Sequence, residues 1–511
     1  MKGGEVLLIG AGPGDPGLIT WKGIQALREA DVVIYDHLVA PELLEHCREG
    51  CELIYVGKQS GSHTLSQQEI NRLMVRKATE GLRVVRLKGG DPFLFGRGGE
   101  EAQALRRAAI RFQVVPGVTS AIAAPAYAGI PVTHRDRSSS VAIVTGHEDQ
   151  NKTCSNIRWE RLSGAADTLV FLMGVKNLSF IVEKLLVNGR DPSTPAALIQ
   201  WGTTPGQRVL TAPLRAIVEK AHEAKIGPPA VLVVGDVVCL REQLNWVDDL
   251  PLWGKRILVT RAREQASDLA QRLRLLGAQA VEFPTISIGP PSDLDLLDRA
   301  ISQLGDYQWV VFTSPNGVRW FFERLREKGK DCRALAGLSI AVIGPGTEKA
   351  LERRGLRADL VPAEFRAEAL AEALSEVELK GKRVLVARAE EARDVLPMAL
   401  LELGAFVNVV PVYKTVLPQP REGQLESILA GGSLDAITFT SSSTVRNLVA
   451  LAGVECLHKL LDGVTVACIG PVTAQTARQH GIDPHVVASN YTIEGLVEAL
   501  VSVLGPRRLE R

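Results

Sequence analysis

Two glycine-rich loops near the start of the chain could hold a small charged ligand. One lies within VLLIGAGPGDPGLIT, the other reads LKGGDPFLFGRGGEE from Leu87 to Glu101, and each leaves a run long enough for a β-strand. Because glycine has no side chain, it lets the backbone approach a ligand closely. Asp91 adds a carboxylate that can accept hydrogen bonds from an ammonium group or a ribose hydroxyl. S-adenosylmethionine carries both groups, so the two loops together favour a site for this nucleoside.

The first loop begins like a dinucleotide-binding fingerprint but does not complete it. After Gly10 and Gly12, Asp15 replaces the third glycine of GxGxxG. Pro13 also removes a backbone amide that could have faced a pyrophosphate. An NAD site is therefore disfavoured. The chain also has neither a Walker loop nor an iron–sulfur cysteine pattern.

These loops require an α/β scaffold, because short β-branched runs alternate with helical stretches over residues 1–245. The expected strands read EVLLIG, DVVIYD, RVVRLKG, FQVVPG, VAIVTG, TLVFLMG, AALIQWG and AVLVVGDVV. Most of them end in Gly, Asp or Pro, which predicts loops at their carboxyl ends, where open α/β sheets bind ligands. We therefore expect the site on these loops.

A second α/β region follows a break in the pattern, which places a linker at 246–254. GKRILVTRAREQ at Gly254 reappears 127 residues later (381 − 254) as GKRVLVARAEEA at Gly381. FTSPNGV and AVIGPGTEKALERRG are repeated in the same way as FTSSSTV and ACIGPVTAQTARQHG. The period is too long for a solenoid, whose units have about 20 to 50 residues. Residues 255–505 are therefore expected to form two similar α/β lobes with a cleft between them.

The bulk composition excludes several classes of protein. The 511 residues carry a formal net charge of +1, with 46% hydrophobic and 23% charged residues, as in a folded multidomain enzyme. A nearly neutral chain has no overall attraction for nucleic acid or an anionic membrane, so neither is expected as a partner. The seven cysteines are scattered and odd in number, unlike a secreted disulfide framework. The first residues do not resemble a signal peptide, and we expect a cytoplasmic protein.

Two features suggest a membrane span and a metal site, and both interpretations are rejected. The stretch between Arg111 and Arg135 contains no Asp, Glu, Lys or Arg and is long enough to cross a bilayer. Three prolines interrupt it, however, and its small residues indicate a buried segment close to a ligand site. His46, Cys47 and Cys51 are close in sequence, but no second cluster has zinc-site spacing. No metal is therefore expected.

In its first half the chain resembles the uroporphyrinogen-III methyltransferases of the tetrapyrrole methylase family. The shared blocks are GAGPGDPGLIT, YDHLV, VGK, GGDPFLFGRGGEE, VPGVTSA, GIPVTHRD and FLMGV, closed by PPAVLVVGDVVCLREQLNW. They cover nearly all of 1–245. The resemblance implies two α/β lobes with S-adenosylmethionine between them. It also implies cofactor contacts at matching positions of these blocks: Pro13, Gly89, Gly90, Asp91, Leu94, Thr119, Ser120, Met173 and Gly202.

Some of these residues have a structural interpretation when the family is set aside. Met173 alone would be read as core packing. Thr119 or Ser120 alone would be read as a helix N-cap.

The resemblance also implies two residues for the chemistry. Methyl transfer from a sulfonium to a pyrrole carbon requires alignment, and the ring must then lose a proton. The family pattern places the proton acceptor at Asp36 in YDHLV and a proton donor at Lys58 in VGK. Taken alone, Asp36 could be a turn or capping residue and Lys58 a solvated charge. The family usually has Arg-Leu-Val-Ser after this aspartate, whereas residues 37–40 read His-Leu-Val-Ala, which leaves the substrate contacts less defined.

Several basic residues are candidates for holding the substrate. Uroporphyrinogen III is rich in carboxylates, and guanidinium groups bind carboxylates through paired hydrogen bonds. The alternative for each residue is ordinary surface charge. The candidates are Arg97, His134, Arg135 and Arg137.

Residues 255–505 resemble uroporphyrinogen-III synthase through KRILVTRA, FTSPNGV, IGPGT, GKRVLVARAE, VYKT, FTSSSTV, IGPVTA and NYTIEGLVEAL. The resemblance implies two flavodoxin-like lobes, the first built from both ends of this region and the second from its middle. It also implies closure of hydroxymethylbilane to uroporphyrinogen III with loss of water and inversion of the last ring, without cofactor or metal.

Three hydroxyl groups match positions that face the cleft in that family. They are Tyr413 in VYKT, Thr347 in IGPGT and Thr473 in IGPVTA. Either threonine could instead cap the helix that follows it. Tyr413 is therefore the preferred catalytic candidate.

The complete prediction is an α/β chain with a two-lobed tetrapyrrole methylase fold at 1–245, followed by a two-lobed flavodoxin-like uroporphyrinogen-III synthase fold at 255–505. The synthase half would make uroporphyrinogen III. The methyltransferase half would use two S-adenosylmethionine molecules to methylate C2 and C7, giving precorrin-2 for sirohaem or cobalamin. The alternative is a methylase for another corrinoid precursor, joined to a degenerate half that only binds or regulates. The partners implied are small tetrapyrroles and, from the family, a second copy of the chain.

Overall fold

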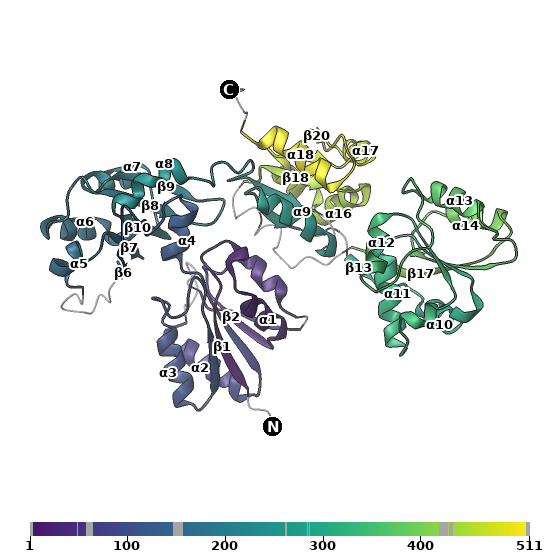
Figure 1. Cartoon of the computed structure of the whole chain (residues 1–511), viewed down its shortest axis with the longest axis horizontal. Helices are drawn as coiled ribbons and strands as arrows, with labels where there is room; N and C mark the ends of the chain where they lie inside the picture. The colour runs from purple at the N-terminus through teal and green to yellow at the C-terminus, as the bar shows by residue number, and fades with distance from the viewer. Residues whose placement is uncertain are drawn as a thin grey trace. The chain divides into compact units, whose positions relative to one another are not determined.

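The computed structural model describes residues 4–48, 50–57, 65–146, 157–260, 263–283, 285, 287–417, 428 and 433–506. These residues form four five-stranded sheets, so the chain is α/β as predicted (Figure 1). They divide into two compact units. The first runs to Arg256 and includes Leu273–Gln279, and the second holds Ile257–Arg272 and Ala280–Val503.

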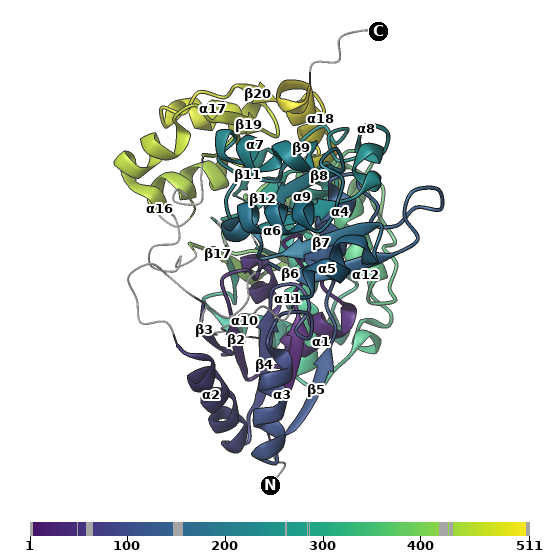
Figure 2. The ribbon, with the colours of Figure 1, turned by 90° about the vertical axis from the view of Figure 1, so that its left-hand side faces the viewer.

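The first sheet is parallel throughout. Its strands are β1 (Glu5–Gly10), β2 (Val32–Tyr35), β3 (Glu52–Tyr55), β4 (Arg83–Lys88) and β5 (Arg111–Val115), in the order β3-β2-β4-β1-β5. Side chains of α1 (Trp21–Glu29) pack on one face. Side chains of α2 (Gln67–Thr79) and α3 (Gly98–Arg107), which Figure 2 shows side by side, pack on the other. Because the chain leaves β1 and β4 on opposite faces, the switch point of this sheet lies between these two strands.

The second sheet of the first unit is mixed. Its strands are β6 (Val141–Thr145), β7 (Thr168–Leu172), β8 (Pro195–Gln200), β9 (Arg208–Pro213) and β10 (Ala230–Val234), in the order β6-β7-β10-β8-β9. Only β6 and β7 run parallel, since β10 is antiparallel to β7 and β8, and β8 is antiparallel to β9. One face packs on α5 (Trp159–Ala165), α6 (Leu178–Val187) and α7 (Ile217–Glu223), and the other on α4 (Ser120–Tyr127).

Helix α4 lies in the apolar stretch between Arg111 and Arg135. Its residues 121, 123, 124 and 125 are buried, and the helix packs against β7, β8 and β10. The prediction of a buried segment is confirmed. In the part of the chain that the structure describes, no helix is both long and apolar enough to span a bilayer.

The second unit begins with a sheet drawn from both ends of its sequence. The strands are β11 (Arg256–Val259), β12 (Gln279–Glu282), β18 (Ala436–Phe439), β19 (Thr465–Cys468) and β20 (Val486–Val487), in the order β12-β11-β18-β19-β20. The helices of this lobe are α9 (Arg263–Leu275), α16 (Ser442–Leu461), α17 (Pro471–Gln479) and α18 (Ile493–Leu504).

The middle of the sequence forms the other sheet. Its strands are β13 (Ser287–Gly289), β14 (Trp309–Phe312), β15 (Ser339–Val342), β16 (Arg383–Ala389) and β17 (Phe406–Val416), in the order β13-β17-β16-β14-β15. Only β13 is antiparallel to its neighbour. The helices are α10 (Leu294–Ser302), α11 (Pro315–Glu327), α12 (Pro345–Glu352), α13 (Ala367–Ser375) and α14 (Val395–Glu402). The predicted composition of the two lobes is confirmed.

The internal repeat and the lobes do not have the same boundaries. The repeated GKR segments form β11 and β16, and the repeated FTS segments form β14 and β18. In the sheets, however, β11 pairs with β18, and β16 pairs with β14. Each lobe therefore combines the first strand of one sequence repeat with later strands of the other.

The segment between the two regions is packed against its surroundings. It follows α8 (Arg241–Leu244), and Val247 and Leu252 are fully buried. The Leu252 amide donates to the Leu276 carbonyl at 2.9 Å. A Cβ atom on Gly277 would lie 3.0 Å from the Leu250 Cβ atom. This segment is thus joined to the residues that end α9.

Candidate functional site

Three loops at the carboxyl edge of the first sheet meet backbone to backbone. A Cβ atom on Gly117, which follows β5, would lie 2.2 Å from the Gly90 carbonyl oxygen and 2.6 Å from the Gly10 Cα atom. Gly12 and Gly90 also exchange two backbone hydrogen bonds, of 3.3 and 2.7 Å. Any side chain at Gly10 or Gly117 would therefore force the loops after β1, β4 and β5 apart.

Asp91 fastens this junction through its side chain. One carboxylate oxygen accepts hydrogen bonds from the backbone amides of Phe93 at 2.8 Å and Leu94 at 3.0 Å. The other accepts from the Gly117 amide at 2.9 Å. The loop after β4 is thus folded on itself and tied to the loop after β5. Asp91, predicted as a cofactor contact, also has a clear structural role.

A second set of contacts joins the Pro13 loop to the loop after β8. The Asp15 amide donates to the Thr203 hydroxyl at 3.1 Å, and Tyr127 donates its hydroxyl proton to the Asp15 carboxylate at 2.6 Å. Burial and the nearby Asp15 charge raise the pKa of Tyr127. A Cβ atom on Gly202 would lie 2.4 Å from the Ala124 Cβ atom, so this loop is also packed on α4.

Several residues around these loops have a strained backbone. Met173 and Trp201 follow β7 and β8 with φ values of 57° and 50°, and Phe95 lies between Asp91 and α3 with a φ of 52°. These side chains are 51%, 41% and 40% exposed. A non-glycine residue in the left-handed region costs roughly 1–3 kcal/mol, and such residues concentrate at functional sites. The interpretation of Met173 as core packing is therefore wrong.

The remaining cofactor candidates lie on α4 and in the loop after β4. Thr119 is the N-cap of α4, with its hydroxyl accepting from the Ala121 amide at 3.2 Å, which confirms the capping interpretation. Ser120 is the first residue of that helix. Leu94 packs against the buried residues between α4 and the second sheet.

Asp36 directly follows β2. It lies next to the glycine junction, the place where the backbones of Gly10, Gly90 and Gly117 meet. One of its carboxylate oxygens accepts from the Leu38 amide at 3.3 Å, so the interpretation as a turn residue is confirmed. A Cβ atom on Gly89 would lie 2.6 Å from the Leu38 Cβ atom, which places this turn against the loop after β4. The side chain of Asp36 is 27% exposed. Lys58 lies outside the described residues.

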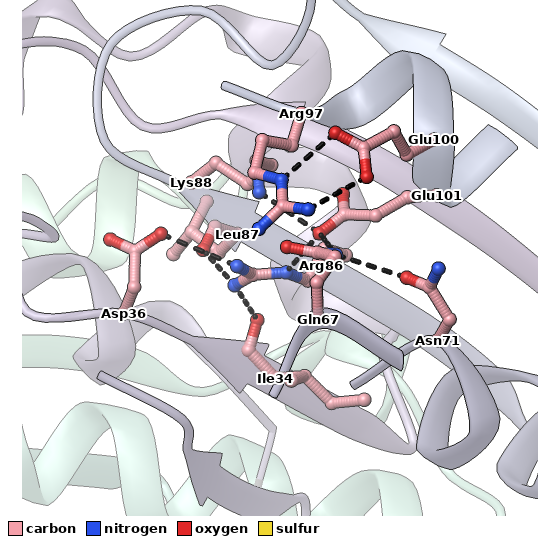
Figure 3. Close-up of polar contacts among 10 residues, drawn as sticks. All are labelled: Ile34, Asp36, Gln67, Asn71, Arg86, Leu87, Lys88, Arg97, Glu100 and Glu101. Carbon is pink, nitrogen blue, oxygen red and sulfur yellow. Dashed lines mark hydrogen bonds and ion pairs between the residues drawn. The ribbon is translucent and has the colours of Figure 1, made fainter. Parts of the chain in front are cut away.

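A buried charged cluster behind Asp36 was missed by the sequence reasoning. Arg86 and Lys88 on β4 are 3% and 5% exposed, and both donate to one oxygen of the fully buried Glu101, at 3.1 and 2.9 Å (Figure 3). Burial and then the Arg86 charge lower the pKa of Lys88, while Glu101 opposes this shift. The sequence carried a signal, since the strand RVVRLK places Arg86 and Lys88 inside an element that parallel sheets normally bury.

The proposed substrate clamps lie at the surface. Arg97 is 57% exposed and forms paired hydrogen bonds of 2.9 and 2.8 Å with Glu100. His134 is half-buried, while Arg135 and Arg137 are exposed. Their assignment stays a prediction. In the described ranges, no three His, Cys, Asp or Glu side chains are grouped so that they could hold a metal ion.

In the second unit, Tyr413 lies in the core of the middle lobe. It is 8% exposed, and its hydroxyl lies 3.1 Å from that of Ser314, which also accepts from the Gly317 amide at 3.0 Å. Burial raises the pKa of Tyr413. Ser314 was missed, although the FTS repeat pairs it with Ser441. Both serines are helix N-caps, of α11 and α16.

The capping interpretation of Thr347 and Thr473 is wrong. The N-caps of α12 and α17 are Gly344 and Gly470, and neither helix has a capping hydrogen bond from a side chain. The threonines lie inside the first turn, 2% and 5% exposed. The N-cap position precedes the helix, and the Gly-Pro step moves that position to the glycine.

Comparisons with known proteins identify both halves. A family model described as Tetrapyrrole (Corrin/Porphyrin) Methylases matches residues 5–218, and one described as Uroporphyrinogen-III synthase HemD matches 267–498. A porphyrin biosynthesis protein HemD of Ruminiclostridium josui is 40% identical over 505 residues, covering 99% of both chains.

Two further proteins resemble parts of the chain. A uroporphyrinogen-III C-methyltransferase of Bacillus subtilis is 47% identical over 356 residues, covering 70% of this chain and 72% of that protein. The crystal structure of a Thermus thermophilus uroporphyrin-III C-methyl transferase complexed with S-adenyl homocysteine is 40% identical, covers 46% of this chain and 99% of that chain, and has a TM-score of 0.40. From the family models and the two sequence relatives, the chain belongs to the tetrapyrrole methylases in its first half and to the uroporphyrinogen-III synthases in its second, as a fusion with uroporphyrinogen-III C-methyltransferase and uroporphyrinogen-III synthase activities.

Proposed function

We propose that the two halves catalyse consecutive steps. The second half closes hydroxymethylbilane to uroporphyrinogen III, with loss of water and inversion of the last ring. The first half then transfers two methyl groups from S-adenosylmethionine to C2 and C7, giving precorrin-2. The observation that carries this proposal is the full-length relative, a porphyrin biosynthesis protein that spans both halves at 40% identity.

The glycine junction fits S-adenosylmethionine, which supplies the methyl group from its sulfonium. Gly90 has a φ of 67°, and a Cβ atom there would meet nothing within 4 Å, so the backbone borders open space. The proposed contacts are those at and around this junction: Pro13, Gly89, Gly90, Asp91, Leu94, Thr119, Ser120, Met173 and Gly202. Met173 is exposed, and the loop of Gly202 packs on α4. Both residues follow strands of the second sheet, so the proposed contacts come from both sheets of the first unit. This supports the assignment, because the cofactor is expected between the two lobes.

Asp36 is proposed to accept the proton that the methylated ring loses. Each transfer forms a bond between the methyl group and a pyrrole carbon and breaks the methyl–sulfur bond, after which the ring proton passes to the Asp36 carboxylate. Its position beside the loop after β4 and its partial exposure support this role. Lys58 is proposed as a proton donor from the family pattern alone.

Arg97, His134, Arg135 and Arg137 are proposed to bind the carboxylates of uroporphyrinogen III. The geometry of Arg97 supports this role, because its guanidinium already holds the Glu100 carboxylate through paired hydrogen bonds. A substrate carboxylate could replace Glu100 in the same geometry.

In the synthase half, Tyr413 is proposed as the acid that protonates the hydroxyl group leaving as water. The phenol is protonated at neutral pH, as an acid must be, because its ordinary pKa of about 10 is well above 7 and burial raises it further. The buried hydroxyls of Thr347 and Thr473 are proposed to assist, since neither is used as a helix cap.

Incubating the full chain with hydroxymethylbilane, with and without S-adenosylmethionine, tests both halves. We expect uroporphyrinogen III without the methyl donor and its dimethylated product with it, identified by mass and isomer analysis. The type-I isomer alone would mean that the second half is a binding module. A product with a different number of methyl groups would indicate a methylase for another corrinoid precursor.

A further inference from the structure

Arg86 connects the interior of the first sheet to Asp36. It lies on β4 opposite Ile34 of β2, and its guanidinium donates to the carbonyl oxygens of Ile34 at 3.3 Å and Leu87 at 3.1 Å. A terminal nitrogen also donates to the Asp36 carboxylate at 3.4 Å (Figure 3). The arginine is thus fixed to β2, the strand that directly precedes Asp36, and to the side chain of Asp36 itself.

Glu101 holds the other side of the same guanidinium. It is 0% exposed, and one carboxylate oxygen accepts from the Arg86 Nε atom and from Lys88. The Gln67 amide, on α2, donates to the same oxygen at 3.1 Å. The second oxygen is buried and has no hydrogen-bond partner among the described residues. Helices α2 and α3 therefore keep Arg86 from turning away from Asp36.

The charges of the cluster balance only when Asp36 is counted. Arg86 and Lys88 supply two buried cations, and Glu101 supplies one carboxylate. A buried charge needs a partner of opposite sign, and Asp36 provides it at the exposed end of the cluster. On β3, burial and then the charge of Asp36 raise the pKa of the Tyr55 hydroxyl.

We propose that Arg86 is a positioning residue for the methyl transfer, which holds the Asp36 carboxylate at the end of β2 in the orientation that accepts the ring proton. This inference rests on the proposed role of Asp36. Arg86 binds the Asp36 carboxylate on the side of the sheet interior, and the Asp36 side chain remains partly exposed, so one side of the carboxylate is available to the substrate. Glu101 acts one step further back by fixing the guanidinium.

A double-mutant cycle on the full chain tests the inference. The variants are Arg86→Gln, Asp36→Ala and the double variant, assayed with uroporphyrinogen III and S-adenosylmethionine, and kcat is normalised to the binding stoichiometry of S-adenosylhomocysteine. We expect Arg86→Gln to lower kcat by up to roughly 100-fold, as a misplaced catalytic group does, with little change in either KM. In the Asp36→Ala background the same substitution should have no further effect, because coupled residues are not additive.

Two further variants separate positioning from folding. Arg83→Gln removes an arginine from the other end of β4, where it pairs with Glu5 and Glu29, and should leave kcat and KM unchanged. Arg86→Lys keeps the charge but loses the fork that reaches Asp36 and Glu101 together. It should fold and recover only part of the rate, and it serves as the test variant if Arg86→Gln does not fold.

The outcomes distinguish this inference from the proposed function. If Asp36→Ala retains the wild-type rate, the role of Asp36 is wrong and the inference falls with it. If Asp36→Ala is slow but Arg86→Gln or Arg86→Lys has the wild-type kcat, only the inference is overturned. Additive losses in the double variant would also overturn it, because Arg86 would then act independently of Asp36.

Discussion

Replacing Asp91 with alanine should loosen the cofactor loops of the first unit. The carboxylate accepts three backbone hydrogen bonds that close the loop after β4 and tie it to Gly117. A hydrogen bond to a charged group contributes roughly 1.5–3 kcal/mol. The three bonds share one half-buried carboxylate and are not additive, so we expect a loss of about 2–4 kcal/mol.

This loss should appear in the affinity for S-adenosylmethionine. Without the Asp91 carboxylate, the ligand must reorganise the loops as it binds, and each 1.4 kcal/mol is a factor of ten in Kd. Asp91→Ala should therefore bind S-adenosylhomocysteine about 30-fold to about 1,000-fold more weakly by calorimetry. Asp91→Asn should be intermediate, because its amide nitrogen must face either Gly117 or the Phe93 and Leu94 amides, and all of these are donors.

A matched substitution and a second measurement make the prediction refutable. Asp191→Ala also removes a carboxylate that accepts a hydrogen bond from a loop amide, that of Ser193 at 2.7 Å, but this loop lies at the amino end of β8. The affinity of Asp191→Ala for S-adenosylhomocysteine should therefore match that of the wild type. The ligand-free Asp91→Ala protein should also unfold at a lower temperature. If affinity falls with no change in unfolding, Asp91 acts as a direct ligand rather than a brace. If neither changes, the reasoning is refuted.

Four further predictions concern stability, the synthase half and the cofactor loops. Arg324 and then Lys328 lower the pKa of Asp298 to about 2, so the stabilisation that this carboxylate provides is present above the usual pKa of about 4 and is lost as the pH falls toward 2. Asp298→Asn should therefore lower the free energy of unfolding by roughly 1–2 kcal/mol at neutral pH, after allowance for solvent screening. The difference between the variant and the wild type should vanish on acidification. Tyr413→Phe should melt almost normally yet yield less type-III and more type-I product, and a wild-type rate would remove its catalytic role. Gly117→Ala should abolish measurable cofactor binding, because the new Cβ atom would lie 2.2 Å from a backbone oxygen, whereas Gly164→Ala, with nothing within 4 Å, should bind normally. A fragment that starts at residue 246 should unfold at a higher temperature than one that starts at 255, because the segment between them is buried against the end of α9.

Much of the fold of the first unit could be predicted from local pattern. The eight expected strands all form, because each is rich in apolar and β-branched residues and most of them end in a residue suited to a turn. Strands β3 and β9 were not predicted. Both lie at sheet edges, where only part of the strand is buried and the apolar pattern is weak.

The candidate site was predicted less completely than the strands. The glycine positions of the site could be identified, because a residue without a side chain lets its backbone approach another backbone or a ligand closely. The charges of Arg86 and Lys88 inside a strand were visible in the sequence, but their partner could not be assigned, since a charge in a strand can face solvent or a buried group. Their partner Glu101 lies 15 residues beyond Arg86 on a separate helix.

By itself the sequence determined the strands, the glycine loops and the repeated motifs, because these follow from local sterics and from the pattern of apolar residues. Only the tertiary structure decided which residues meet. It brought Glu101 under Arg86 and Asp36, and it paired β11 with β18 and β16 with β14, across the boundaries of the sequence repeat. The physical reason is that a strand's pattern specifies which face is buried, whereas its neighbour is selected by the packing of the whole lobe.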